Sequence, residues 1–320
     1  MGALSLLNFV LVALPIGSTL GVLLGLQAHR DATGQEPLFK PTNPNTPPKN
    51  DGITLVHKCN ETVGISPASV GDKYTLNPNP WGWSEGEEGS ICMDVITWNN
   101  QTYPTKSSAP EWSVTWEYPA GSTNAPVHAF PNVKVDSGTF PVKISKLKSI
   151  YLDFEWSYAV GNTTAVTTTD VDELETAELN ANVALDMFLD SDKTASKSSE
   201  DARIEMMVWF ATFGPSTVPI GNTTTDAVVD TLEVDGTTFS LYAGKNNIGQ
   251  RVLTWYSQGT ADRFHGDLML FVNRLVELGE TQFPTGDDYI GYASLGTETY
   301  WVSETVTFHV PTLAFDIETD

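Results

Sequence analysis

The chain has 320 residues, a formal net charge of −23 at pH 7 and a sequence pI near 4.4. A chain this acidic offers no basic patch that could neutralise a phosphate backbone, so most nucleic-acid-binding roles are excluded. Charged residues make up only 18% of the chain and aromatic residues 10%. This composition predicts a globular protein with one sizeable core and argues against a disordered acidic tail.

The N-terminal segment is almost wholly apolar from Leu4 to Leu26, and no Lys or Arg precedes Arg30. The run approaches the roughly 20 residues that span a bilayer, whereas a signal peptide ordinarily starts with basic residues and ends at a small-x-small cleavage site. Residues 1–28 are therefore predicted to be either a membrane anchor or a cleaved signal peptide, and both imply export. Residues 29–50 are polar and Pro-rich, which predicts an extended linker. Residues 51–320 then form one domain.

Cysteine usage and sequons also indicate an extracellular protein, either secreted or tethered to the cell surface. In an oxidising compartment, Cys59 and Cys92 favour one disulfide that ties the first two strands together, and two buried free thiols are the alternative. No Cys or His cluster has metal-ligand spacing, so neither a metal nor a cofactor is predicted. Four Asn-x-Thr sequons in polar, loop-like contexts are acceptors for N-glycosylation: Asn60, Asn100, Asn162 and Asn222.

Short alternating runs separated by Gly, Pro, Asn and Ser dominate the domain. The clearest predicted strands span residues 112–118, 148–158, 182–189, 238–243, 251–256 and 304–310. This spacing predicts an antiparallel β-sandwich or jelly roll. Helical period occurs only from Ala261 to Gly279, where apolar residues recur at intervals of three and four. A single helix packed on the convex back of a curved sheet would leave the concave face free for a ligand.

The stretch from Asp201 to Phe210 (DARIEMMVWF) places one acid in an otherwise apolar run. In a strand, successive side chains point to opposite faces, so Glu205, Met207 and Trp209 share one face. The opposite face is wholly apolar and suits a core. A face with a carboxylate, a thioether and an indole suits a groove for a sugar, because aromatic rings stack on its C–H faces. The alternative is an edge strand whose solvent face carries a Glu.

Two further acids lie in similar settings. Asp186 belongs to the run NVALDMF, and Glu298 lies between small and aromatic residues in LGTETYW. Glycoside hydrolysis usually requires one carboxylate as nucleophile or base and one carboxylic acid as proton donor. The chain carries 40 acidic residues, so each of these acids taken alone is better explained as a solvated surface group.

The order of several motifs resembles that of glycoside hydrolase family 12, which comprises single-domain β-jelly-roll endoglucanases and xyloglucanases. The resemblance covers residues 53–315, and its most specific elements are Glu-x-Met-x-Trp at 205–209 and Gly-Thr-Glu at 296–298. The motifs are YTLNPNPWG (74–82), FEWSY (154–158), NVALDMF (182–188), IEMMVWFATFG (204–214), PIGN (219–222), FHGDLMLF (264–271) and LGTETY (295–300).

The resemblance implies an all-β jelly-roll sandwich of two curved antiparallel sheets with one helix on the convex side. It also implies that Glu205 is the nucleophile, Glu298 the general acid/base and Asp186 an auxiliary acid that contacts the nucleophile. The resemblance further implies that Asn79 and Trp81 bind the sugar and that Cys59 and Cys92 form a disulfide. The strand argument adds Met207 and Trp209 as substrate-binding walls of the same groove.

The expected function is that of a monomeric, retaining endo-β-1,4-glucanase acting on cellulose-like, mixed-linkage or xyloglucan chains. A xyloglucan-specific endoglucanase and a noncatalytic carbohydrate-binding jelly roll are the alternatives. The sequence departs from the family pattern at the sugar-binding rim, where Asn77-Pro-Asn79-Pro replaces Asn-Asn and Trp83 replaces a small residue. It also has Thr299-Tyr300 after the acid, where the family pattern has Pro-Phe. These departures bear on substrate preference and leave both catalytic Glu in place.

Overall fold

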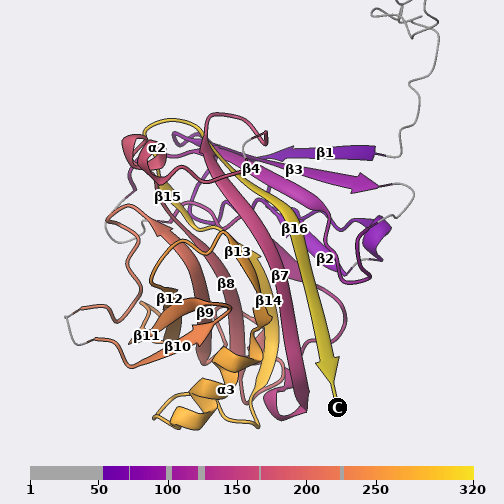
Figure 1. Cartoon of the computed structure of the whole chain (residues 1–320), viewed down its shortest axis with the longest axis vertical. Helices are drawn as coiled ribbons and strands as arrows, with labels where there is room; N and C mark the ends of the chain where they lie inside the picture. Colours follow the sequence, from indigo (N-terminus) through magenta and orange to yellow (C-terminus); the bar gives the residue numbers. More distant parts are fainter. Residues whose placement is uncertain (1–52, 72, 99–102, 122–126, 166, 224–226) are drawn as a thin grey trace, which may run out of the picture. The chain divides into compact units, whose positions relative to one another are not determined.

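A computed structural model of the chain (Figure 1) describes residues 53–320 except 72, 99–102, 122–126, 166 and 224–226. The chain divides into two compact units, 1–51 and 52–320. The predicted N-terminal segment, the predicted linker and the sequon at Asn100 lie outside the described residues. Within the described ranges, no helix is long and apolar enough to cross a membrane.

The described strands form two sheets. The six-stranded sheet has the order β1 (Ile53–Cys59), β3 (Ser90–Trp98), β4 (Glu111–Glu117), β16 (Val306–Thr319), β7 (Leu147–Val160) and β13 (Arg263–Asp267). The ten-stranded sheet has the order β10 (Asp230–Val234), β11 (Thr237–Lys245), β12 (Arg251–Ser257), β9 (Ile204–Phe213), β8 (Asn180–Asp190), β14 (Tyr289–Gly296), β5 (Asn132–Val135) and β2 (Tyr74–Asn77). In the same sheet, β15 (Thr299–Trp301) pairs with β8, and β6 (Val142–Lys143) pairs with β14.

This arrangement confirms the predicted jelly-roll sandwich, and the six predicted strands correspond to β4, β7, β8, β11, β12 and β16. One detail of the prediction is wrong, because the sheets are not wholly antiparallel. Strand β12 runs parallel to β9, with Arg251 opposite Ile204 and Tyr256 opposite Trp209. Strand β11 is antiparallel to both β10 and β12, so β10 and β12 run in the same direction as β9.

The helical segments differ from the prediction in two ways. Helix α3 spans Met269–Leu278, not the whole of 261–279, because residues 263–267 form β13 and pair with β7. The side chain of Asp267 accepts the N–H groups of Ile150 and Met269 at 3.0 and 2.9 Å, which ends the strand and starts the helix. Gly279 ends α3 in the left-handed conformation (φ 59°), as predicted.

A second helix, α2 (Val171–Thr176), was not predicted, because six residues that bury only Leu174 give no readable periodicity. It begins at Asp170, whose side chain accepts the N–H of Glu173 at 3.1 Å. Three short 3₁₀ turns complete the described helical structure: η1 (Ala68–Val70), η2 (Ile144–Lys146) and η3 (Ala195–Lys197).

The core lies between the sheets and under α3. Along β9, Ile204, Met206, Val208 and Phe210 are fully buried on the face predicted to be apolar. Helix α3 packs on this same side of the ten-stranded sheet, where the ring of Phe271 lies 4.9 Å from Phe239 of β11 and 5.6 Å from Trp255 of β12. The helix therefore covers the convex side and leaves the concave face of the sheet open.

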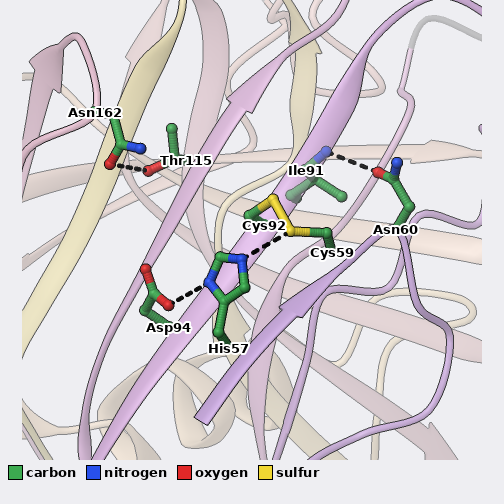
Figure 2. Close-up of a disulfide and its surroundings, with 8 residues drawn as sticks. All are labelled: His57, Cys59, Asn60, Ile91, Cys92, Asp94, Thr115 and Asn162. Carbon is green, nitrogen blue, oxygen red and sulfur yellow. Dashed lines mark hydrogen bonds and ion pairs between the residues drawn. A yellow bond between two sulfur atoms is a disulfide. The ribbon is translucent and has the colours of Figure 1, made fainter. Parts of the chain in front are cut away.

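The predicted disulfide is present. Cys59 and Cys92 lie directly opposite each other and join edge strand β1 to β3, with the ring of His57 beside them (Figure 2). His57 Nδ1 lies 2.6 Å from a carboxylate oxygen of Asp94, and its Nε2 lies 3.1 Å from the sulfur of Cys59. Ile53 and Leu55 of β1 are exposed. The disulfide thus fastens a strand that contributes little to the core.

Three sequons lie in loops at the surface, as predicted. Asn60, Asn162 and Asn222 are all exposed. The side-chain oxygen of Asn60 accepts the N–H of Ile91 at 2.9 Å, and that of Asn162 accepts the hydroxyl of Thr115 at 3.4 Å (Figure 2). Their glycosylation remains a prediction.

Candidate active site

The concave face of the ten-stranded sheet brings residues from five strands into one row. Lys134 of β5 lies opposite Ser294 of β14, which lies opposite Asp186 of β8, followed by Met207 of β9 and Thr254 of β12. Glu205 precedes Met207 by two residues and lies on the same face, diagonal to Asp186. Diagonal neighbours in antiparallel strands are about 7–8 Å apart at Cα, within reach of long side chains. The strand register therefore brings the two acids together.

A cleft of about 790 Å³ lies over this row. Six of the seven predicted site residues line it, namely Asn79, Trp81, Asp186, Glu205, Met207 and Glu298. Its other walls come from the β8–β9 and β11–β12 connections, including Lys197, Ser199, Asn246, Asn247 and Ile248. A cleft of this size accommodates a small molecule or part of a polymer chain.

Trp209 does not line the cleft, so the prediction that it provides an open sugar platform does not match the structure. Its side chain is only 3% exposed and packs with Ala184, Met207, Val252 and Tyr256. The small side chain of Ala184, directly opposite Trp209, leaves room for the indole beside the sheet. The indole N–H points to the sulfur of Met207 at 3.3 Å. Trp209 thus supports Met207, which does line the cleft.

Trp81 lies at the rim and is 59% exposed. It follows Asn79, whose backbone adopts a positive φ of 46°. The side-chain oxygen of Asn77 accepts the N–H of Asn79 at 2.9 Å, and the carbonyl of Asn79 accepts the N–H groups of Trp81 and Phe130 at 2.9 and 3.0 Å. This tight turn, which includes the departure Asn77-Pro-Asn79-Pro from the family pattern, holds the exposed Trp81 ring beside the cleft.

Glu205 is half-buried in the cleft wall. Asn246 donates a long hydrogen bond of 3.5 Å to its Oε2 and is itself fixed by Gln250, with side-chain and backbone bonds of 2.8 and 3.0 Å. Burial raises the pKa of Glu205 from 4.5 to about 7, the charge of Glu298 adds to this, and the Asn246 bond opposes it. Asn246 was missed in the sequence, because nothing distinguishes it from other polar loop residues.

Glu298 lies between β14 and β15 and is attached to Asn182 of β8. Its backbone N–H donates to the side-chain oxygen of Asn182 at 2.9 Å, and its backbone oxygen accepts the N–H of Asn182 at 3.2 Å. The side-chain amide of Asn182 also donates to Oε2 of Glu298. The hydroxyl of Tyr300 donates to the same oxygen at 3.4 Å. Burial raises the pKa of Glu298, while these two donors oppose the rise.

Asp186 completes the group of three acids. Burial raises its pKa well above the usual value, and the charges of Glu205 and Glu298 add to this effect. Its Oδ1 is buried and has no hydrogen-bond partner among the described residues. Three carboxyl groups in one low-dielectric cleft cannot all be ionised at neutral pH. Burial and mutual repulsion therefore favour the protonated form of at least one of these carboxyl groups at neutral pH, which is what acid–base chemistry on a sugar requires.

The described residues offer one group with the spacing of a metal site, formed by His57, Cys59 and Cys92. It lies at the disulfide and not in the cleft. Because the two sulfurs are bonded to each other, neither is a thiolate that could bind a metal.

A jelly-roll sandwich whose concave face gathers three carboxyl groups in one cleft suits the hydrolysis of a sugar chain, and the comparison with known families shows that this chain is a glycoside hydrolase. The model of glycosyl hydrolase family 12 matches residues 72–318. The chain belongs to this family, as its motifs predicted.

Related proteins agree with this assignment. The chain is 30% identical over 237 residues to xyloglucan-specific endo-β-1,4-glucanase A of Emericella nidulans. The aligned region covers 74% of this chain and 82% of that protein. It is 28% identical over 230 residues to a probable xyloglucan-specific endo-β-1,4-glucanase A of Aspergillus flavus, covering 72% and 79% of the two chains.

Solved structures show the same fold. Endoglucanase 3 of Trichoderma harzianum superposes with a TM-score of 0.63 at 23% identity, covering 82% of this chain and 98% of that one. A family 12 xyloglucanase from Bacillus licheniformis superposes with a TM-score of 0.58 at 17% identity, covering 83% and 100%.

Proposed function

We propose that the protein is a retaining endo-β-1,4-glucanase that hydrolyses internal bonds of β-glucan chains by double displacement. The observation that carries the proposal is the convergence of Glu205, Asp186 and Glu298 on one concave face. The carboxylate of Glu205 attacks the anomeric carbon, and the bond to the leaving oxygen breaks as that oxygen takes the proton of Glu298. Glu298 then takes a proton from a water molecule as the oxygen of that water attacks the anomeric carbon, and the bond from this carbon to Glu205 breaks.

Asp186 has a supporting role in this mechanism. With its pKa raised by burial and by the two neighbouring acids, Asp186 stays protonated and can donate a hydrogen bond to Glu205. Such a bond favours the ionised nucleophile, although burial alone favours its neutral form. Met207 and the exposed ring of Trp81 provide apolar contacts for the sugar chain, and Asn79 provides polar ones.

Xyloglucan is the favoured substrate. The two sequence relatives described above bear the name of xyloglucan-specific enzymes. Two residues that line the cleft, Trp81 and Ile248, are 59% and 64% exposed, so their side chains are available for contact with the side groups of a branched chain. Cellulose-like and mixed-linkage glucans remain the alternatives. The sequons and the disulfide support action outside the cytoplasm. We further propose that the protein acts as a monomer that is either secreted or tethered through residues 1–28.

Two measurements test the proposal. Reducing-sugar release from soluble β-glucans with and without xylosyl branches gives the substrate, and activity on unbranched chains alone would contradict the xyloglucan preference. Proton NMR of the first product gives the stereochemistry. A β-anomer is expected, and an initial α-anomer would exclude Glu205 as nucleophile.

Variants assign the two roles. Glu205→Ala should abolish turnover of every substrate, because no covalent intermediate can form. Glu298→Ala should retain formation of that intermediate from aryl glycosides whose leaving group needs no proton, and added azide should then speed its breakdown. Glu233→Ala, at an exposed position of β10, is the control and should behave as the wild type.

A further inference from the structure

The two side-chain oxygens of Glu298 are in different surroundings. Oε2 accepts the amide N–H of Asn182 and the hydroxyl of Tyr300, which lies 3.4 Å away. Within the described part of the chain, no hydrogen bond to Oε1 is observed. A carboxyl oxygen that already accepts two donors is a poor place for a proton, because the proton would meet donor hydrogens. The proton of the neutral acid therefore belongs on Oε1.

Asn182 is itself held rigidly. Its side chain is fully buried, and its backbone carbonyl accepts the hydroxyl of Thr297 at 2.5 Å. The hydroxyl of Tyr158 lies 3.1 Å from that of Thr297 and accepts the indole N–H of Trp116 at 2.8 Å. This chain of hydrogen bonds connects the six-stranded sheet to the backbone of Asn182, so the buried core holds the residue that contacts the acid.

Building on the proposed function, we propose that Asn182 and Tyr300 are positioning residues that hold Oε2 of Glu298, so that Oε1 is the atom that gives the proton to the leaving group and later takes one from water. The side-chain oxygen of Asn182 accepts the N–H of Glu298, and the N–H of Asn182 donates to the carbonyl of Glu298, so these two bonds fix the main chain at the acid. The amide of Asn182 and the hydroxyl of Tyr300 fix the rotation of the carboxyl group. Tyr300 is one of the departures from the family pattern. The family pattern has Phe at this position, and Phe has no hydroxyl to donate.

The same contacts set the pH range of the acid. Both donors favour the ionised form of Glu298, and therefore lower its pKa against the effect of burial. The titratable groups that face Glu298 are Glu205 and Asp186, whose pKa values its charge raises, and Tyr300, which donates to it. Burial raises the pKa of Tyr300, so its hydroxyl remains a donor. Loss of a donor raises the pKa of Glu298, and the alkaline limb of the pH–rate profile then moves to higher pH.

The test measures kcat/KM against pH for the full-length protein and three variants on a soluble xyloglucan and on an aryl glycoside with a good leaving group. Asn182→Ala is expected to shift the alkaline limb upward by roughly one pH unit and to lower kcat on xyloglucan on the order of 10- to 100-fold, as for loss of a hydrogen bond to a charged group. Tyr300→Phe should shift the limb in the same direction by less, because its bond is longer.

Asn180→Ala is the matched control. Asn180 lies on the same strand and is also buried, but its side chain donates to Glu178 and accepts from Ser216, not from the acid. The Asn180→Ala variant should lower thermal stability as Asn182→Ala does, but the alkaline limb of its pH–rate profile should stay at the wild-type pH. If the wild type is active and neither Asn182→Ala nor Tyr300→Phe moves the alkaline limb, the positioning role is wrong. If the wild type hydrolyses no β-glucan, the proposed function itself fails.

Discussion

Replacement of the proposed nucleophile should make the protein more stable at alkaline pH. Burial raises the pKa of Glu205 from 4.5 to about 7, so the folded state disfavours its ionisation relative to the unfolded chain. Below pH 4.5 the carboxyl is protonated in both states and has no effect. As the pH rises to 7 the unfolded chain loses this proton first, and stability falls. Above pH 7 the whole cost is present.

The size of this cost follows from the two pKa values. They differ by about 2.5, and each pKa unit corresponds to 1.36 kcal/mol, which gives about 3 kcal/mol. Glu205→Gln keeps the shape of the side chain and its contact with Asn246 but removes the charge. The variant should therefore be about 3 kcal/mol more stable than the wild type at pH 8 and equally stable at pH 4, while it loses activity.

Urea unfolding followed by tryptophan fluorescence at pH 4, 6 and 8 measures this directly. Glu233→Gln on β10 removes one exposed charge from the same sheet and controls for the change in net charge. A Glu205→Gln protein that is no more stable than the wild type at pH 8, or that gains equally at pH 4, would refute the electrostatic reasoning.

Three further predictions concern the disulfide and the two tryptophans. Cys59→Ala with Cys92→Ala should lower the free energy of unfolding by about 4 kcal/mol, because the disulfide closes a loop with a sequence separation of 33; an unchanged urea midpoint would contradict this. Trp81→Ala should weaken binding of oligosaccharides in calorimetry without lowering Tm, since its ring is exposed. Trp209→Ala should lower the free energy of unfolding by about 3 to 5 kcal/mol. A loss of affinity for oligosaccharides at unchanged Tm would instead show that Trp209 binds the sugar directly.

Side-chain alternation allowed most of the fold to be predicted, because a strand with one buried face has apolar residues at every second position of its sequence. The pattern of β9 assigned Ile204, Met206, Val208 and Phe210 to the core, and all four are fully buried. The start of α3 could not be predicted in this way. Phe264 and Leu268 fit a helical period, but Phe264 lies in β13 opposite Phe154. Only the partner strand, more than a hundred residues away, decides between the two structures.

The candidate site shows the same limit of local patterns. Alternation placed Glu205, Met207 and Trp209 on the cleft face, but it could not show that Ala184 leaves space for the Trp209 ring to lie within the wall. Asn182 shares a strand face with Asp186, which is a signal visible in the sequence. Its contact with Glu298 is not visible, since the two residues are 116 positions apart. Polar residues that act through a distant partner are found only when the strand register is known.

The Gly-Thr-Glu motif illustrates how backbone packing serves the acid. Gly296 is buried where β5 comes so close that an added Cβ would lie 1.9 Å from the carbonyl oxygen of Pro131 and 2.8 Å from Cα of Asn132. The N–H of Thr297 donates to that same carbonyl at 3.2 Å. Gly296→Ala must therefore push β14 and β5 apart immediately before Glu298, at a cost of about 1 to 3 kcal/mol.

The Gly296→Ala substitution should therefore displace Glu298 in a protein that still folds. We expect Gly296→Ala to reduce kcat on xyloglucan at least 100-fold in a protein that is still folded, because a displacement of about 1 Å at a reacting group is sufficient for a loss of this size. Gly259→Ala is the control, since nothing lies within 4 Å of its added Cβ. Circular dichroism and Tm measured on the same samples separate the two effects. A folded Gly296→Ala protein with wild-type kcat would show that Glu298 does not depend on this close approach of the two strands.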